Sequence, residues 1–96
     1  MTDLELTKAC AEAMNIRMYD DWSYDPLHDN AQAMALVKKF KLSCSWHAQP
    51  PDEVWEVTTP YAPVRGASVD LNRAICECAA KTHGLEWLKA YTHPSA

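Results

Sequence analysis

Two stretches in the first half of the chain repeat apolar residues at the spacing of an amphipathic helix. The first is predicted over residues 3–14, because Thr2 and Glu5 form a capping box at its start. The second follows Asp29, a good N-cap residue that has Gln32 at the capping-box position. Acidic residues begin the first stretch and lysines end the second, as the helix dipole favours. Both stretches are therefore predicted to be helices with one apolar face.

A third helix is predicted in the last third of the chain, where the apolar spacing is most regular. Ser68 is expected to cap this helix, and Gly84 is expected to end it, because glycine readily adopts the left-handed conformation of a helix terminator. Residues 85–96 are expected to form a C-terminal tail of one or two helical turns docked on the body. The apolar positions of the third helix are Leu71, Ala74, Ile75, Cys78, Ala79 and Thr82.

Residues 42–48 and 53–59 alternate apolar and polar side chains with the period of a β-strand. The two stretches are joined by a short segment with two prolines, which predicts a hairpin. When the two strands of this hairpin pair, their apolar side chains share one face of the sheet and their polar side chains share the other. The predicted pairs are Ala48 with Glu53, Trp46 with Trp55 and Cys44 with Val57, and the polar face carries Ser43, Ser45, His47, Glu56 and Thr58.

Pro60 and Pro63 are expected to end the second strand and to begin a connecting loop. Together these elements predict an α+β fold. We expect a small antiparallel sheet with at least one hairpin, packed with about three helices as a single-domain sandwich over residues 1–96. The 48% hydrophobic content is enough for a small core, although a chain of this size buries only about two-thirds of its unfolded surface.

The charge balance narrows the classes of expected partner. Thirteen acidic and nine basic residues leave a net charge of −4, with a pI near 5.4. Direct nucleic-acid binding is not expected, because it requires a basic stripe and a high pI. Two glycines provide no phosphate-binding loop. No apolar run approaches the roughly 20 residues of a membrane span, and no secretory signal begins the chain, so we expect a cytoplasmic protein.

Four cysteines raise the question of a metal site. Cys44 and His47 have a Cys-x2-His spacing, and Cys76 and Cys78 form a Cys-x-Cys pair, which together have the residue types of a zinc site. However, residues three apart on a strand face opposite sides, and residues two apart on a helix point about 200° apart. We therefore predict no metal ligands and no cofactor. Cys44 and Cys78 are expected in the core, and Cys76 is expected to lie off the core beside Glu77.

One constellation has the residue types of an active site, namely Ser45, His47 and Glu56 on the polar sheet face. It lacks the nucleophile elbow and the oxyanion loop of a hydrolase, so an exposed strand histidine is the favoured interpretation. No catalytic residue and no enzymatic activity are predicted.

An acidic loop with two aromatic residues precedes the second helix. It lacks the glycine turn and the closing glutamate of a calcium loop. Two interpretations of its aromatic residues stand side by side: exposed anchors of a protein-binding hot spot, or lids folded over a small core. The first gives a predicted partner-binding site formed by Asp20, Asp21, Trp22, Tyr24 and Asp25.

Three stretches follow one another in a recognisable order. Residues 24–31 read Tyr-Asp-Pro-Leu-His-Asp-Asn-Ala, residues 36–43 read Leu-Val-Lys-Lys-Phe-Lys-Leu-Ser, and residues 73–80 read Arg-Ala-Ile-Cys-Glu-Cys-Ala-Ala. This order resembles the phage ABA sandwich group, small proteins of tailed bacteriophages and prophages that are similar to the phage NinX proteins. The resemblance covers most of residues 3–84. It implies a sandwich with helices over both sheet faces, and it transfers no catalytic residue.

The resemblance and the composition together lead to a functional hypothesis. We expect a non-enzymatic, phage-encoded protein in the cytoplasm of the bacterial host that binds and modulates a host protein, for example as an anti-CRISPR inhibitor. Its acidic surface suits the basic groove of a nucleic-acid-binding partner. The alternative is a structural or oligomerising accessory protein of phage replication or recombination, such as a homodimer joined through the polar sheet face or the tail.

Overall fold

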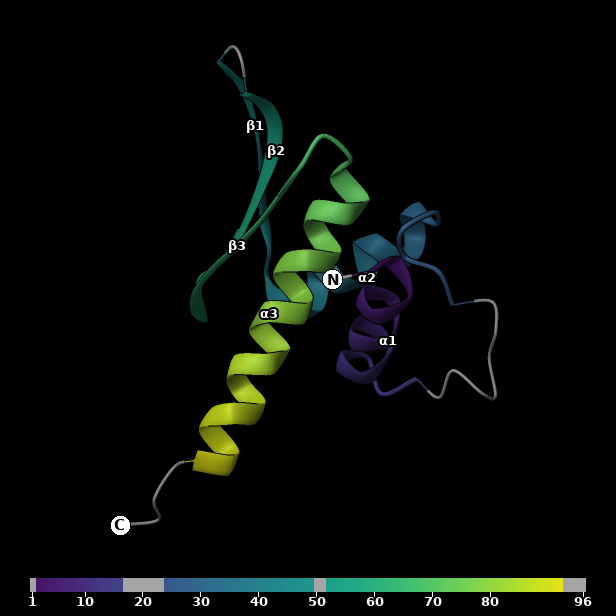
Figure 1. Cartoon of the computed structure of the whole chain (residues 1–96), viewed down its shortest axis with the longest axis vertical. Coiled ribbons are helices and arrows are strands. Elements are labelled where there is room, and N and C mark those ends of the chain that lie inside the picture. The colour runs from purple at the N-terminus through teal and green to yellow at the C-terminus, as the bar shows by residue number, and fades with distance from the viewer. Residues whose placement is uncertain (1, 17–23, 50–51, 93–96) are drawn as a thin grey trace.

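The computed structural model describes residues 2–16, 24–49 and 52–92, with the backbone alone for residues 49, 52, 62 and 85–92. Figure 1 shows helices packed beside an antiparallel sheet, which confirms the predicted α+β class. The elements in chain order are α1 (Asp3–Ala13), α2 (Asn30–Phe40), β1 (Ser43–Gln49), β2 (Asp52–Thr59), β3 (Ala62–Ser68) and α3 (Leu71–Thr92).

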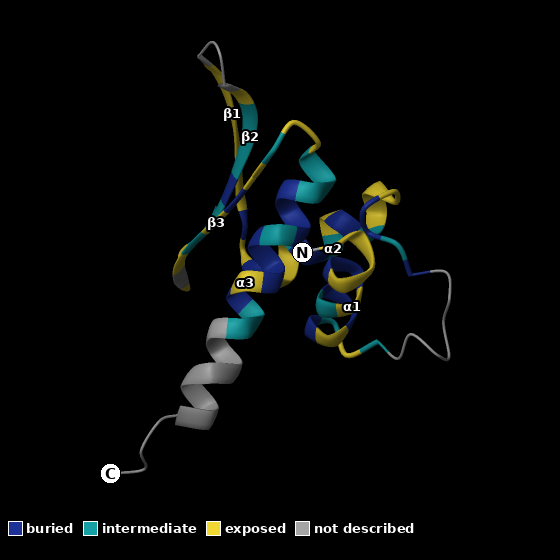
Figure 2. Cartoon of the chain, in the orientation of Figure 1, coloured by how far each residue is buried: buried dark blue, intermediate teal, exposed yellow. Residues whose placement is uncertain are grey.

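The three helices lie on the same side of the sheet. α3 packs against β3 and β2 on one side and against α1 and α2 on the other, so it forms a middle layer (Figure 1). Buried residues concentrate where α3 meets its neighbours (Figure 2). The described layers are therefore the sheet, then α3, then α1 with α2. They differ from the arrangement that the resemblance implies, in which helices cover both faces of the sheet.

The middle position of α3 buries more of its surface than the sequence pattern predicts. The backbone of α3 at Ala74 and Cys78 lies against Gly66 of the sheet. Cys76 interacts with α1 instead, where the Cys10 thiol donates a 3.5-Å hydrogen bond to its carbonyl oxygen. Cys76 is fully buried, so the prediction that it lies off the core is wrong. A helix that packs on two sides needs apolar residues on both.

Two of the three predicted N-terminal caps, Thr2 and Asp29, are present. The prediction that Ser68 caps the third helix is wrong, because Ser68 is the last residue of β3 and α3 begins only at Leu71. The Glu5 amide donates a 3.2-Å hydrogen bond to the Thr2 hydroxyl, and the Gln32 amide donates a 3.0-Å hydrogen bond to the Asp29 carboxylate. The side-chain oxygen of Gln32 reaches beyond the cap and accepts a 2.6-Å hydrogen bond from the Asp25 amide. The segment before α2 is therefore tied to the first turn of that helix.

Removing the α2 cap is expected to reduce the free energy of unfolding by about 1 kcal/mol. Asp29→Ala leaves the Gln32 amide without its side-chain acceptor, whereas Asp29→Ser retains a hydroxyl acceptor. Urea denaturation should therefore rank Asp29→Ala below both the wild type and Asp29→Ser. Equal stability of the two variants would contradict the role of this side chain as a cap.

The predicted hairpin is confirmed in its register. β1 pairs antiparallel with β2, with Trp46 opposite Trp55. The two indole rings lie 5.3 Å apart between centroids in a tilted arrangement, which is a favourable geometry for an aromatic pair. A one-residue slip would move every apolar side chain to the other face, so the alternation, together with closure of the hairpin at Ala48 and Glu53, predicted this pairing. The other predicted pairs, Cys44 with Val57 and Ala48 with Glu53, are also present.

A third strand, β3, occupies the segment that was predicted to be a loop. It pairs antiparallel with β2 and completes the order β1-β2-β3. Pro63 and Gly66 are typical loop residues, but both suit this strand. An edge strand tolerates proline, and Gly66 lies directly beneath α3, where a Cβ would come within 2.0 Å of the Ala74 carbonyl oxygen. The loop prediction is wrong because the packing of α3 requires glycine here.

The sheet has one face toward α3 and one face away from it. On the α3 face, Val57 is fully buried opposite Gly66. Cys44 is the partner of Val57 on β1, yet it is exposed, so the prediction of a core position for Cys44 is wrong. The reason is that α3 packs over β3 and β2 and leaves the outer strand accessible. Each residue from 43 to 48 is exposed.

α3 continues through the glycine that was predicted to end it. The helix runs from Leu71 to Thr92 and includes Gly84, which has no positive φ. The segment after Gly84 is rich in good helix formers, which favours continuation over termination. The tail is therefore helical as far as Thr92, and the side chains that would dock it lie outside the described residues. Although α3 has 22 residues, no helix in the described part is long and apolar enough to cross a membrane.

Candidate protein-interaction surface

The predicted partner-binding loop is described only at its C-terminal end. Asp20, Asp21 and Trp22 lie outside the described residues. Tyr24 is buried, with 5% of its surface exposed, and its hydroxyl has no hydrogen-bond partner among the described residues. Burial raises the pKa of this hydroxyl above its ordinary value. Of the two interpretations of the aromatic residues, Tyr24 follows the second and forms a lid on the core.

Asp25 adjoins Tyr24 and is held by its neighbours. Its carboxylate lies 2.8 Å from Nδ1 of His28, and its amide donates to Gln32. The carboxylate side chain is nevertheless 46% exposed. Asp25 is thus the one predicted partner-binding residue that the described part of the structure presents at the surface.

A different aromatic pair lies at the surface on the hairpin. We call Trp46 and Trp55 the indole patch. Trp46 is 47% exposed, and Trp55 is partly buried against the core. The patch lies on the α3 side of the sheet, in the same row as Ser68, which pairs with Trp55.

The path of α3 explains why the indole patch is accessible. α3 starts at Leu71, directly after β3, and contacts the sheet mainly through β3. Figure 1 shows the β1–β2 hairpin projecting beyond the first turn of α3. α3 packs closely against β3 and β2 but not against β1, the strand that carries Trp46. Sequence alternation assigned both tryptophans to the apolar face correctly, but it carries no information on how far the helix covers that face.

The opposite face of the sheet is polar, as predicted. Glu56 forms an ion pair with Arg65, with 2.9 Å between Nη1 and Oε2, and the same oxygen lies 3.8 Å from Nε2 of His47. Ser45 pairs with Glu56 in the register. The three members of the proposed constellation thus lie together, but the carboxylate is shared with an arginine. This arrangement fits a surface charge network.

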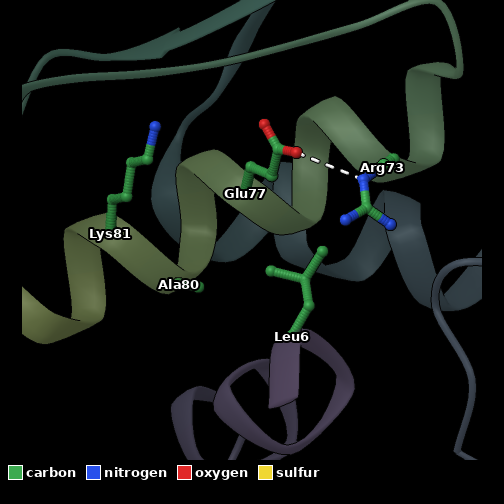
Figure 3. A pocket seen from close by; sticks show the side chains of 5 residues that line it. All are labelled: Leu6, Arg73, Glu77, Ala80 and Lys81. Atoms are coloured by element: carbon green, nitrogen blue, oxygen red, sulfur yellow. Dashed lines mark ion pairs between the residues drawn. The ribbon is translucent and has the colours of Figure 1, made fainter. Parts of the chain in front are cut away.

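A groove between α1 and α3 was not anticipated from the sequence. It forms a pocket of about 260 Å³, and Figure 3 shows the side chains that line it, which are Leu6, Arg73, Glu77, Ala80 and Lys81. Arg73 pairs with Asp3 of α1 and, at 3.3 Å, with Glu77. The ammonium of Lys81 donates a 2.8-Å hydrogen bond to the Arg65 carbonyl oxygen in β3. Arg73 and Lys81 therefore link α3 to other elements of the fold. The charged side chains of this groove thus have a structural role.

The four thiols fall into two groups. Cys10, Cys76 and Cys78 are buried, and Cys44 is exposed. A side-chain hydrogen bond with Cys10 and burial raise the pKa of the Cys76 thiol, and burial raises the pKa of the Cys78 thiol. A raised pKa keeps a thiol protonated and poorly nucleophilic. Cys44 and His47 lie three apart on β1 and so face opposite sides of the sheet. Among the described residues, no group of three His, Cys, Asp or Glu side chains could hold a metal ion.

Thiol labelling should separate Cys44 from the other cysteines. Desolvation raises the pKa of the Cys44 thiol too, so the assay is run at mildly alkaline pH with a disulfide reagent. We expect one thiol per folded chain to react rapidly, and all four to react in denaturant. The Cys44→Ser variant should lose the rapid phase. Two or more rapid thiols in the folded wild type would contradict the buried positions of the other three.

Comparison with known proteins adds no relative. No protein-family model, no curated protein and no solved structure matches this chain.

Proposed function

We propose that this protein is a non-enzymatic binding domain that contacts another protein through the indole patch. The observation that carries the proposal is Trp46, a large aromatic side chain that is 47% exposed on a projecting hairpin. Tryptophan is enriched among the residues that dominate protein–protein binding energy. Its ring centroid lies 5.3 Å from that of Trp55, and a side chain that is already packed loses less entropy when a partner buries it.

The net charge supports a partner with a basic surface. At −4 the chain is acidic overall, and opposite charge on a partner accelerates association. The resemblance to phage ABA sandwich proteins supports a bacterial host protein, and a nucleic-acid-binding host protein would supply the basic surface. Our proposal is therefore a phage-encoded protein that binds and modulates such a host protein, for example in anti-defence.

Capture from a bacterial lysate with matched variants tests this proposal. Trp46→Ala removes the exposed indole, and Tyr61→Ala removes an aromatic side chain of similar exposure, 54%, from the turn between β2 and β3. A partner that binds the indole patch should lose at least about 30-fold in affinity for Trp46→Ala, since a hot-spot residue contributes about 2 kcal/mol or more. Tyr61→Ala should bind as the wild type does.

A third variant tests the acidic loop separately. Asp20→Asn, Asp21→Asn and Asp25→Asn together remove three charges from the predicted loop site. Loss of the partner from this variant, with normal binding by Trp46→Ala, would transfer the contact to the loop and overturn the indole patch. Loss from Trp46→Ala alone supports the patch.

A further inference from the structure

Among the described residues, nothing pairs with the outer edge of the sheet at β1. β1 pairs with β2 on one side only, and none of the helices has β1 among the elements it packs against closely. In an edge strand, alternate residues turn their amide and carbonyl groups outward, where they can pair with another strand. Each residue from 43 to 48 is exposed, so this edge is accessible over these positions.

β1 also lacks the features that protect edge strands from pairing. Such features are proline, lysine and other charged side chains, and bulges. The sequence of β1, Ser-Cys-Ser-Trp-His-Ala-Gln, has no proline, lysine or acidic residue. The other edge of the sheet, β3, has Pro63 and Arg65, and the irregularity of the sheet lies on its side, between Thr58 and Thr59 of β2. The two edges therefore differ, and β1 is the unprotected one.

The side-chain pattern of β1 is symmetric about its centre. Trp46 is the middle residue, small apolar side chains lie two positions away on either side, and polar side chains occupy the remaining positions. When two such strands pair antiparallel about Trp46, each side chain lies opposite one of the same kind: aromatic, small apolar or polar. The resulting pairs are Trp46 with Trp46, Ser45 with His47, Cys44 with Ala48 and Ser43 with Gln49.

We propose that β1 pairs antiparallel with β1 of a second copy about a two-fold axis beside Trp46. The two three-stranded sheets then form one continuous sheet, and the interface is isologous, as in most homodimers. A second copy is the favoured occupant because the strand is self-complementary and because no acidic or lysine side chain on β1 opposes a second β1. The two indole patches then lie side by side on one face. This inference does not rest on the proposed function.

Sedimentation equilibrium of the purified chain tests the assembly. We expect a concentration-dependent species of twice the 10.8-kDa chain mass. Trp46→Lys places two ammonium groups at the axis and should give a monomer. Tyr61→Lys introduces the same charge at an exposed aromatic residue outside β1 and should still dimerise. A wild-type chain that remains monomeric at all concentrations, or a Trp46→Lys variant that dimerises like Tyr61→Lys, would overturn the proposal.

Disulfide trapping tests the proposed register of the β1–β1 pairing. It does not require the Trp46→Lys variant to fold. Ala48→Cys places a thiol opposite Cys44 of the second copy, and diamide should oxidise the two thiols to an intermolecular disulfide, itself taking up the two hydrogen atoms. Covalent dimer on a non-reducing gel is expected for Ala48→Cys. It is not expected for the wild type or for Ala48→Cys combined with Cys44→Ser. No covalent dimer from Ala48→Cys, or equal amounts from the double variant, would contradict this pairing.

Because both measurements use the isolated chain, they are independent of host-protein capture. A dimer that captures no partner would leave the strand pairing supported and the proposed function contradicted. A monomeric chain whose partner is lost in the Trp46→Ala variant would leave the proposed function supported and the strand pairing contradicted.

Discussion

Gly66→Ala is expected to reduce the free energy of unfolding by about 3 kcal/mol, at the upper end of the usual range for overpacking. A Cβ at this position would lie 2.0 Å from the Ala74 carbonyl oxygen and 2.9 Å from the Cys78 amide nitrogen. Both atoms belong to the backbone of α3, so neither can rotate away, and the helix must move off the sheet. In a domain of this size the change corresponds to a fall in Tm of more than about 10 °C.

Gly84→Ala is the matched control for this prediction. A Cβ at Gly84 would have no atom of the described residues within 4 Å, and the residue lies inside α3. Alanine is a better helix former than glycine, so this variant should be more stable than the wild type by about 0.5 to 1 kcal/mol. Thermal and urea denaturation of both variants test the prediction together. Similar stability of the two variants would contradict the close contact between β3 and α3.

Leu6→Ala is expected to reduce the free energy of unfolding by about 3 kcal/mol. Leu6 is fully buried and lies between α1 and α3, at the base of the groove in Figure 3. Removing its side chain leaves a cavity beneath α3 that the surrounding helices can fill only in part. Leu4→Ala makes the same substitution on the same helix at a residue that is 59% exposed, and it should change stability by less than about 0.5 kcal/mol. Equal effects in urea denaturation would show that α1 does not present Leu6 to the core.

Local patterns were sufficient to predict the helices that begin at caps and the pairing of the hairpin. Thr2 and Asp29 each form the expected hydrogen bond. Trp46 lies opposite Trp55, as predicted. This pairing could be predicted because alternation and cross-strand packing involve only residues of one short hairpin. These features are local in sequence, so they can be read before the tertiary structure is known.

Other features depend on contacts between distant segments, and there the sequence was misleading. Gly66 has the appearance of a loop residue, but the backbone of α3 requires it within a strand. Cys76 lies outside the regular apolar stripe, but α3 packs on two sides and buries it. Gly84 has the appearance of a helix terminator, but strong helix formers follow it and α3 continues.

The exposure of the aromatic residues in the candidate site also depends on contacts between distant segments. Alternation placed Trp46 on the apolar face, yet its exposure depends on which strands α3 covers. Tyr24 lies beside an acidic loop that is typical of a binding surface, yet its ring is part of the core. Surface and core positions of aromatic residues could not be separated without the packing of the helix layer.

The indole signals of the protein in complex with its captured partner test the central claim most directly. The chain has four tryptophans, at positions 22, 46, 55 and 87, and single Trp→Phe variants assign their indole N–H resonances in a nitrogen-15 spectrum. If the indole patch is the binding surface, the resonances of Trp46 and Trp55 shift most when the partner is added. Shifts confined to Trp22 or Trp87, with Trp46 unchanged, would contradict the account and place the contact on the acidic loop or on the C-terminal part of the chain.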